Sequence, residues 1–121
     1  MPTPTELNLH QFSRVLEIAF EDGARFNLPC EYLRVYSPSA EVMGHGPGER
    51  ILQLNKEAVG IDRIEPVGNY AVCLHFDDGH NTGIFSWEYL YNLGRDQERL
   101  WAEYLNDLSE AGYTRKSPAQ A

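Results

Sequence analysis

The chain has 121 residues, a formal net charge of −8 and an isoelectric point near 4.9, which together fit one acidic globular domain. Its 10 lysines and arginines are scattered along the sequence. This argues against proteins that bind nucleic acids or acidic membranes, because those need clustered positive charge. The sequence has no apolar run long enough to span a membrane and too few cysteines for a disulfide framework. Its first residues lack the basic and apolar regions expected of a signal peptide. These features predict a cytoplasmic protein.

The first part of the chain is predicted to be a lead-in followed by a β-hairpin and a short helix. Residues 1–12 hold two prolines and show no hydrophobic period, so we expect them to be loosely ordered. Two apolar stretches around the turn sequence Glu21-Asp22-Gly23 predict antiparallel strands at 15–20 and 25–28. The proline that follows the second strand suits the first turn of a helix over 30–35.

The middle of the chain is predicted to be poor in regular structure. Residues 37–50 contain three glycines and two prolines, and they must form a loop that is longer than a minimal connection. The short apolar pieces in 51–64 are interrupted by Gly60 and are compatible with one or two edge strands. Pro66, together with the Gly68-Asn69 pair, predicts a turn before the next strand.

A second hairpin and helix follow this turn. The sequence predicts strands at 70–76 and 82–85 around the turn Asp77-Asp78-Gly79. The hydroxyl of Ser86 is suited to cap a helix that begins at the next residue, and Gly94 is expected to end that helix.

The C-terminal part is predicted to be an amphipathic helix. Its apolar residues recur at three- and four-residue spacing: Leu100, Trp101, Tyr104, Leu105 and Leu108. Gly112 is a suitable end for this helix. We therefore expect a single domain over 1–112 and a disordered tail over 113–121.

One phrase occurs twice in the sequence. Residues 16–33 and 72–90 each contain an apolar run, then Phe, two acidic residues and Gly, and each ends in Glu-Tyr-Leu. A repeated supersecondary unit constrains the fold more than any single residue does. We predict an α+β domain of two β-hairpin-plus-short-helix units, related by a pseudo-twofold axis. They form a mainly antiparallel sheet or a small sandwich, with the amphipathic helix at the C-terminus.

The residues alone offer no coherent catalytic set. His75-Phe76-Asp77 is an H-x-D triplet on a strand, a pattern found in non-haem iron sites, but the second histidine that such a site needs is missing. The glycine-rich run 44–48 is able to form an anion-binding nest, although it lacks the Lys-Ser/Thr pair of a phosphate-binding loop. Ser37, Ser39 and Ser86 have no evident base, so no nucleophilic triad is predicted.

The two cysteines predict different environments. Cys30 lies at a helix start, where the pKa of a thiol can be lowered. Cys73 alternates into a strand and is expected to be a buried, small apolar residue. The spacings of the two cysteines and four histidines match no zinc template. Metal binding therefore stays open as an alternative to purely structural roles.

Several segments carry motifs of a known family: LPCEYLRVYSPSAEV at 28–42 with GHG at 44–46, EPVGNYAV at 65–72, and DDGH at 77–80 with GI at 83–84 and SWEYL at 86–90. They resemble a small bacterial family of unassigned function, DUF971, related to the N-terminal domain of γ-butyrobetaine hydroxylase. The resemblance runs from about residue 8 to 112. It implies a non-catalytic domain, because the oxygenase activity of the hydroxylase belongs to a separate downstream domain. No enzyme activity is therefore expected.

In the hydroxylase, the corresponding domain holds zinc with a Cys-x-Cys-x-x-Cys cluster and a later histidine. The resemblance aligns the three cysteines with Ser37, Ser39 and Val42, and the histidine with His80. Serine hydroxyls are poor zinc ligands and valine is none, so we expect no zinc site and no cofactor, with His80 as a remnant. The alternative is zinc or iron binding at a degenerate site of this type.

The leading interpretation is a small, non-catalytic, cytoplasmic protein-interaction or accessory module, present as a monomer or a weak homodimer. Similar domains are joined to iron–sulfur cluster carrier ATPases, which implies such an ATPase as a partner and a role in iron–sulfur assembly or redox metabolism. The acidic turns are expected to steer a basic partner. The predicted binding surface combines the 37–50 loop with its neighbours: Arg34, Tyr36, Ser37, Ser39, Glu41, His45 and Trp87.

Overall fold

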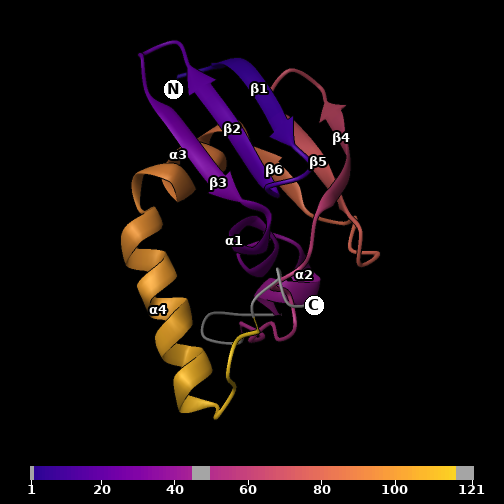
Figure 1. Ribbon diagram of the computed structural model, residues 1–121. Coiled ribbons are helices and arrows are strands. Elements are labelled where there is room, and N and C mark those ends of the chain that lie inside the picture. Colours follow the sequence, from indigo (N-terminus) through magenta and orange to yellow (C-terminus); the bar gives the residue numbers. More distant parts are fainter. Residues whose placement is uncertain (1, 45–49, 117–121) are drawn as a thin grey trace.

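The computed structural model describes residues 2–44 and 50–116, and these form two three-stranded sheets and four helices (Figure 1). The elements in chain order are β1 (Pro4–His10), β2 (Val15–Phe20), β3 (Arg25–Pro29), α1 (Cys30–Val35), α2 (Ala40–Met43), β4 (Ile61–Val67), β5 (Ala71–Phe76), β6 (Ile84–Ser86), α3 (Trp87–Arg95) and α4 (Gln97–Glu110). None of these helices is long and apolar enough to cross a membrane.

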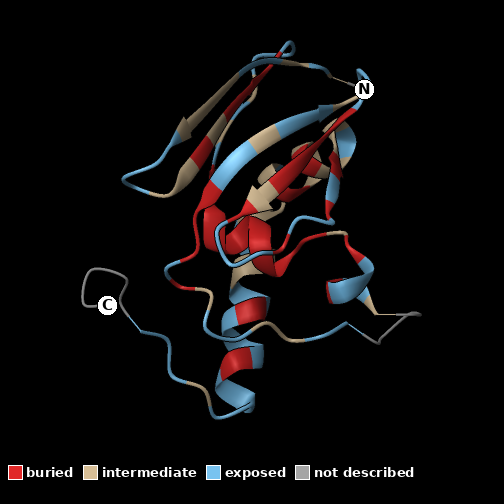
Figure 2. Ribbon diagram, turned by 90° about the vertical axis from the view of Figure 1, so that its right-hand side faces the viewer, coloured by how far each residue is buried: buried red, intermediate tan, exposed pale blue. Residues whose placement is uncertain are grey.

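Both sheets are antiparallel and have the same order, β1-β2-β3 and β4-β5-β6, and a helix follows the last strand of each. Figure 2 shows buried residues concentrated on the middle strands and on α1. Leu16 and Ile18 of β2 share one hydrophobic core with Leu74 and Phe76 of β5. The α+β class and the two hairpin-plus-helix units are thus confirmed. The two copies lie in equivalent units, while their relation by a pseudo-twofold axis stays a prediction.

The turns of the two repeats have the same hydrogen bonds. Gly23 and Gly79 have φ angles of 92° and 90°, in the left-handed region that glycine adopts without steric cost. Each glycine N–H donates to the carbonyl of the phenylalanine that ends the preceding strand. The side chains of Asp22 and Asp78 each accept from the N–H two residues later, at 2.9 and 3.2 Å. The repeated Phe-acidic-acidic-Gly phrase therefore encodes one turn geometry used twice.

Helix α1 lies at the centre of the molecule, with every residue buried. The Tyr32 hydroxyl donates to the carbonyl of Leu93 in α3, and the Tyr36 hydroxyl donates to the carbonyl of Leu100 in α4, both at 2.6 Å. Figure 1 shows α4 extending past the sheets next to α1. These bonds satisfy the polar ends of two aromatic rings whose bodies fill the core.

The apolar face predicted for α4 is largely correct. Tyr104 and Leu108 are buried, and Leu100 and Trp101 pack against the core as partly buried residues. Leu105 is 38% exposed and contributes little. The helix ends at Glu110, and Gly112 follows with a φ angle of 76°.

The lead-in predicted over 1–12 is wrong for residues 4–10, which form β1. This strand pairs with β2 along its length. Leu7 and Leu9 pack against the core, and Pro4 occupies the first position of an edge strand, where its missing N–H leaves no bond unmade. Residues 4–10 show no hydrophobic period of their own. They form a strand because they pair with β2, which lies across the turn at residues 11–14.

The edge strand expected in 51–64 begins only at Ile61, where β4 starts. It continues through Pro66, which the sequence assigns to a turn. A proline is accommodated here because β4 is at the edge of its sheet. The turn begins after Val67, with Gly68 at a φ angle of 54°.

Gly94 lies inside α3 instead of ending it, since the helix continues to Arg95. A Cβ atom at this position would lie 2.3 Å from the ring of Phe26. The Phe26 ring also packs edge-on against Phe20 and Tyr91. The glycine therefore permits a close approach between α3 and β3.

Residues 113–116, which the sequence assigns to a disordered tail, contact the rest of the domain. The Tyr113 hydroxyl and the Lys116 N–H both donate to the Glu57 carboxylate. Arg115 forms a two-pronged ion pair with Glu31 of α1. The contacts of the domain thus extend past Gly112 to Lys116.

Candidate functional site

Residues from two distant segments meet in a polar cluster around the buried His80, here called the His80 cluster: Ser37, Ser39, Glu41, His80 and Thr82. The first three lie after α1 and in the first turn of α2, and the other two follow the turn after β5. The Ser37 Oγ lies 2.9 Å from the His80 Nε2, and the Glu41 Oε2 lies 3.1 Å from the His80 Nδ1. The cluster joins the long loop to the second repeat.

The remaining hydroxyls close this network. The Ser39 Oγ lies 2.6 Å from the Thr82 Oγ1, and the Thr82 hydroxyl donates to the Glu41 Oε1 at 3.1 Å. Ser39 also caps α2, because its Oγ accepts from the Glu41 N–H. The buried Ser37 and Ser39 hydroxyls thus both have partners, as buried polar groups require.

Burial holds the pKa of His80 below its ordinary value, and the nearby Arg34 acts in the same direction. Hydrogen bonding to Glu41 opposes this shift without reversing it. Since a carboxylate only accepts, the Nδ1 of the neutral ring donates to Glu41 and its Nε2 accepts from the Ser37 hydroxyl. The structure therefore gives Ser37 a base, contrary to the sequence analysis.

The contacts run from the Ser37 hydroxyl through the His80 ring to the Glu41 carboxylate, which is the arrangement of groups in a nucleophilic triad. However, Ser37 has no exposed surface. The backbone of Gly83 covers it so closely that a Cβ there would lie 2.3 Å from the Ser37 Oγ. No acyl group has room to reach the hydroxyl, so this arrangement is structural.

A second charged group adjoins the cluster. The Asp78 Oδ2 accepts from the Arg34 Nε and the Lys56 Nζ, both at 2.8 Å. Burial acts to raise the pKa of Asp78, but the hydrogen bonds from Lys56 and Arg34 outweigh it and lower this pKa to about 2. The Arg34 guanidinium is buried, so Asp78 supplies the negative charge that compensates it.

The residues aligned with the zinc ligands of the hydroxylase do lie near one another. The Val42 N–H donates to the carbonyl of Ser39, and Ser37 contacts His80. Val42 offers no ligand atom, and the serine hydroxyls and both His80 nitrogens are already engaged. The residues present do not fit a zinc ion.

The predicted binding surface is divided by the structure. Four of its side chains are buried and bonded internally: Arg34, Tyr36, Ser37 and Ser39. Glu41 is exposed, and Trp87 is partly buried with its indole N–H donating to the carbonyl of Asn69. His45 and the glycine-rich run around it lie outside the described residues.

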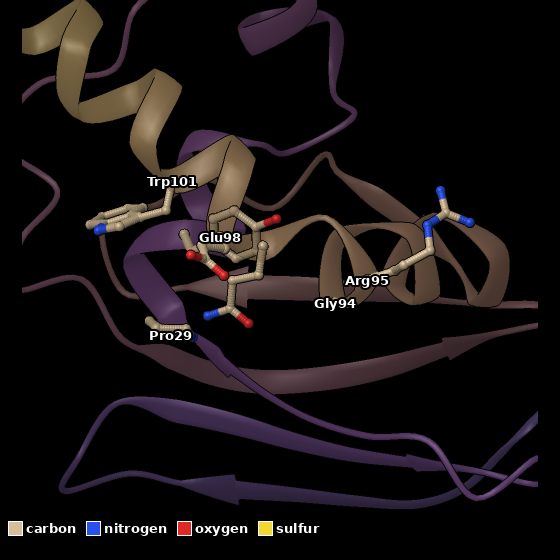
Figure 3. Close-up of a pocket in the computed structure, with 7 residues that line it drawn as sticks. Pro29, Gly94, Arg95, Glu98 and Trp101 are labelled. Carbon is tan, nitrogen blue, oxygen red and sulfur yellow. The ribbon is translucent and has the colours of Figure 1, made fainter.

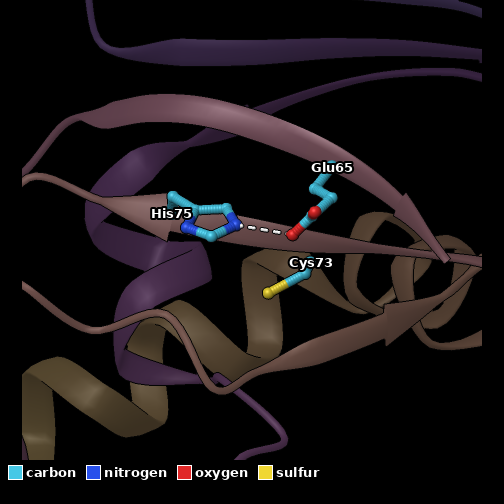
Figure 4. Close-up of side chains that lie close together, drawn as sticks. All are labelled: Glu65, Cys73 and His75. Atoms are coloured by element: carbon cyan, nitrogen blue, oxygen red, sulfur yellow. Dashed lines mark hydrogen bonds and ion pairs between the residues drawn. The ribbon is translucent and has the colours of Figure 1, made fainter.

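The cysteines differ from the sequence-based expectation in an informative way. Burial raises the pKa of the Cys30 thiol to about 11, so the lowered value expected at a helix start is wrong. Cys73 is buried as predicted, but it lies beside two potential ligands, Glu65 and His75 (Figure 4). Cys73 and His75 stand out in the sequence only as separate residues, and Glu65 does not stand out as a ligand. Glu65 can be recognised only from the pairing of β4 with β5, which places it opposite Cys73.

A surface pocket of about 470 Å³ lies where α1, α3 and α4 meet (Figure 3). Glu98 and Trp101 lie on one side of it, and Arg95 points away from them. The Tyr32 hydroxyl in its wall is bonded to a main-chain carbonyl. The residues that line the pocket in the described chain include no histidine, cysteine or serine, so they offer no nucleophile with a base.

Two three-stranded units around a central helix, with a closed polar cluster, define a small α+β domain without an open catalytic cleft among its described residues. The family model "Gamma-butyrobetaine hydroxylase-like, N-terminal" matches residues 7–91. The chain belongs to this family, which confirms the resemblance seen in the sequence.

Solved structures agree with this assignment. Two proteins studied by NMR in solution are 46% and 52% identical, and each has a TM-score of 0.82. The alignments cover 98% and 97% of this chain and 92% and 87% of those chains. A crystal structure of a DUF971 protein of unknown function from Acidithiobacillus ferrooxidans is 44% identical, with a TM-score of 0.64 over 76% of this chain and 92% of that chain. No curated protein matches the chain.

Proposed function

We propose that the chain is a non-catalytic interaction module that binds a protein partner through an exposed part of its long loop. The surface, here called the Met43/Ile51 surface, consists of Met43 and Ile51 with the exposed Glu41 of the same helix as Met43. The two apolar side chains are 41% and 50% exposed, respectively. The Ile51 N–H donates to the carbonyl of Val42 at 2.8 Å, which places Ile51 next to the helix that carries Met43. This exposed apolar pair is the observation that carries the proposal.

The polar groups near this surface support a binding role over a catalytic one. The His80 cluster is satisfied internally, and the described residues contain no buried side-chain polar atom without a partner. A catalytic site usually leaves a reactive group free toward a cavity. Here the same polar groups hold the loop in place beneath its exposed apolar residues.

Charge favours a partner with basic residues around an apolar contact. The chain carries a formal net charge of −8, and Glu41 lies exposed next to the apolar pair. Complementary charge at the rim of an interface speeds association and selects partners, while buried apolar contacts supply most of the affinity. We therefore expect binding that weakens moderately as the salt concentration rises.

The family resemblance suggests which partner to test first. Similar domains are joined to iron–sulfur cluster carrier ATPases, so we propose an ATPase of this type, in the cytoplasm, as the partner. In this proposal the module acts as a monomer or a weak homodimer and has an accessory role in iron–sulfur cluster assembly or redox metabolism.

The test measures the affinity of the purified chain for such an ATPase by a direct binding method. The double variant Met43→Ser/Ile51→Ser is expected to bind at least about tenfold more weakly. Phe12→Ser is the matched control, because Phe12 is fully exposed on the turn between β1 and β2. Equal binding by the wild type and the double variant would rule out this surface, and no binding by any form would reject the partner.

A further inference from the structure

A second cluster of potential ligands lies on the β4-β5-β6 sheet and shares no residue with the His80 cluster. The Cys73 thiol, which donates to the carbonyl of Asn81 at 3.1 Å, brings the two clusters close together. Cys73 and His75 are two residues apart on β5, so their side chains leave the same face of the strand. Val72, which precedes Cys73, and Leu74, which lies between Cys73 and His75, belong to the hydrophobic core on the opposite face. Glu65 of β4 is paired with Cys73 across the sheet. The three side chains therefore converge on the outer face of β4 and β5 (Figure 4).

The distances within this cluster approach those of a metal site. The His75 Nε2 lies 3.0 Å from the Glu65 Oε1, and one ligand atom from each of the three residues lies within 4.8 Å of the others. Bond lengths to zinc imply separations of about 3.3–3.7 Å between tetrahedral ligand atoms. Small side-chain rotations reach that spacing. The main chain need not move, because all three residues lie on paired strands.

We propose that Glu65, Cys73 and His75 bind a Zn²⁺ ion on the outer face of this sheet. Thiolate, imidazole and carboxylate are all zinc ligands, and a site with three protein ligands keeps its fourth position open for water. The site differs from the one that the family resemblance implies, since it shares none of the residues aligned with those ligands. It also does not rest on the proposed interaction surface.

Two features of the cluster set the conditions for binding. Zinc is bound by the thiolate form of a cysteine and not by the protonated thiol. Binding therefore releases the thiol proton to solvent as the Zn–S bond forms, so affinity rises with pH. The Arg63 guanidinium lies 3.2 Å from the His75 Nε2 and opposes a cation there. Its side chain is 63% exposed and is free to turn into solvent.

The first sheet provides a natural comparison. His10, Glu17 and Arg25 form the same kind of imidazole–carboxylate–guanidinium contact, with the His10 Nε2 3.1 Å from the Glu17 Oε1. The residue opposite Glu17 in β1 is Asn8 and that in β3 is Asn27, so no thiol is present. If the Cys73 thiol is required as a ligand, the β4-β5-β6 sheet binds the ion and the β1-β2-β3 sheet does not.

The test is a titration of the reduced chain with Co²⁺, a spectroscopic substitute for Zn²⁺. We expect a single tight ion, a thiolate-to-cobalt charge-transfer band, and loss of this band when Zn²⁺ is added. Cys73→Ser, His75→Ala and Glu65→Gln are each expected to weaken binding by more than about tenfold, with loss of the charge-transfer band in Cys73→Ser. Arg63→Gln is expected to tighten binding about tenfold by removing the opposing charge.

His10→Ala and Glu41→Gln are the controls, because they alter the comparison cluster and the His80 cluster. Both are expected to leave the titration unchanged. Glu65 and His75 lie at the surface of the sheet, so their variants test the site even where Cys73→Ser lowers stability. A charge-transfer band that persists in Cys73→Ser, equal affinity in Glu65→Gln, or loss of binding in Glu41→Gln would overturn the proposal.

Discussion

At Asp78, one carboxylate links three segments that are distant in sequence. It accepts from Arg34 of α1, from Lys56 of the central loop and from the N–H of His80 in its own turn. Because Arg34 is buried, removing the charge of Asp78 leaves a cation without its nearest counter-charge. The cost of such an uncompensated charge exceeds the net value of the ion pair itself.

We expect Asp78→Asn to lower the free energy of unfolding by about 2–3 kcal/mol, because the side chain keeps its size but loses its charge. Urea unfolding followed by circular dichroism measures this change. The control is Asp22→Asn, at the equivalent position of the first repeat, where the carboxylate accepts from Ala24 and Tyr91 and forms no ion pair within the described residues. A loss as large in the control as at Asp78 would contradict the explanation.

The same carboxylate predicts a dependence of stability on pH. The pKa of Asp78 is about 2 in the folded chain and has an ordinary value of 3.8. A lowered carboxylate pKa stabilises the fold above the ordinary value, and this contribution is lost as pH falls toward 2. The difference corresponds to about 2 kcal/mol. Unfolding free energies measured from pH 6 to 2 should therefore converge for the wild type and Asp78→Asn, and a constant difference would refute the assignment.

At the scale of elements, α3 and β3 approach closely because Gly94 has no side chain. Alanine normally stabilises a helix by about 1 kcal/mol relative to glycine. Here its Cβ would meet the ring of Phe26, which is held by two other aromatic rings. Packing thus opposes helix propensity at this position.

We expect Gly94→Ala to destabilise the chain by about 1–3 kcal/mol, the usual cost of overpacking. Thermal and urea unfolding provide the measurement. Ser109→Ala on the exposed face of α4 should have little effect, and Phe26→Leu combined with Gly94→Ala should recover part of the loss. An increase in stability for Gly94→Ala alone would show that the two elements separate easily.

At the scale of the whole molecule, the segment 113–116 holds α1 and the central loop together. Arg115 pairs with Glu31, and its guanidinium carbon lies 5.3 Å from the centre of the Trp101 ring. Tyr113 and Lys116 bond to Glu57. Glu31 and Glu57 are both buried, so each depends on this segment for a partner.

A chain that ends at Gly112 is expected to lose about 2 kcal/mol or more of unfolding free energy, because two buried carboxylates lose their partners. Comparison with a chain that ends at Lys116, by urea unfolding, isolates the contribution of the four residues. Equal stability of the two truncated chains would show that these contacts carry no free energy.

Much of the fold follows from local sequence. The turns at Gly23 and Gly79, the cap at Ser86 and the helix after Pro29 depend on residues only a few positions apart, and all lie where the sequence predicts them. The candidate sites are less predictable. Ser37 and His80 are 43 residues apart, and Glu65 reaches Cys73 only through the register of β4 on β5.

The repeated turn, the α+β class and the family can all be predicted from the chain, because short periodic patterns and turn residues act locally. Long-range packing decided that Arg34 is buried, that residues 4–10 form a strand and that Gly94 continues a helix. It also decided which side chains face His80 and Cys73. These outcomes depend on which distant surfaces pack together, and the free energy of that packing exceeds local preference.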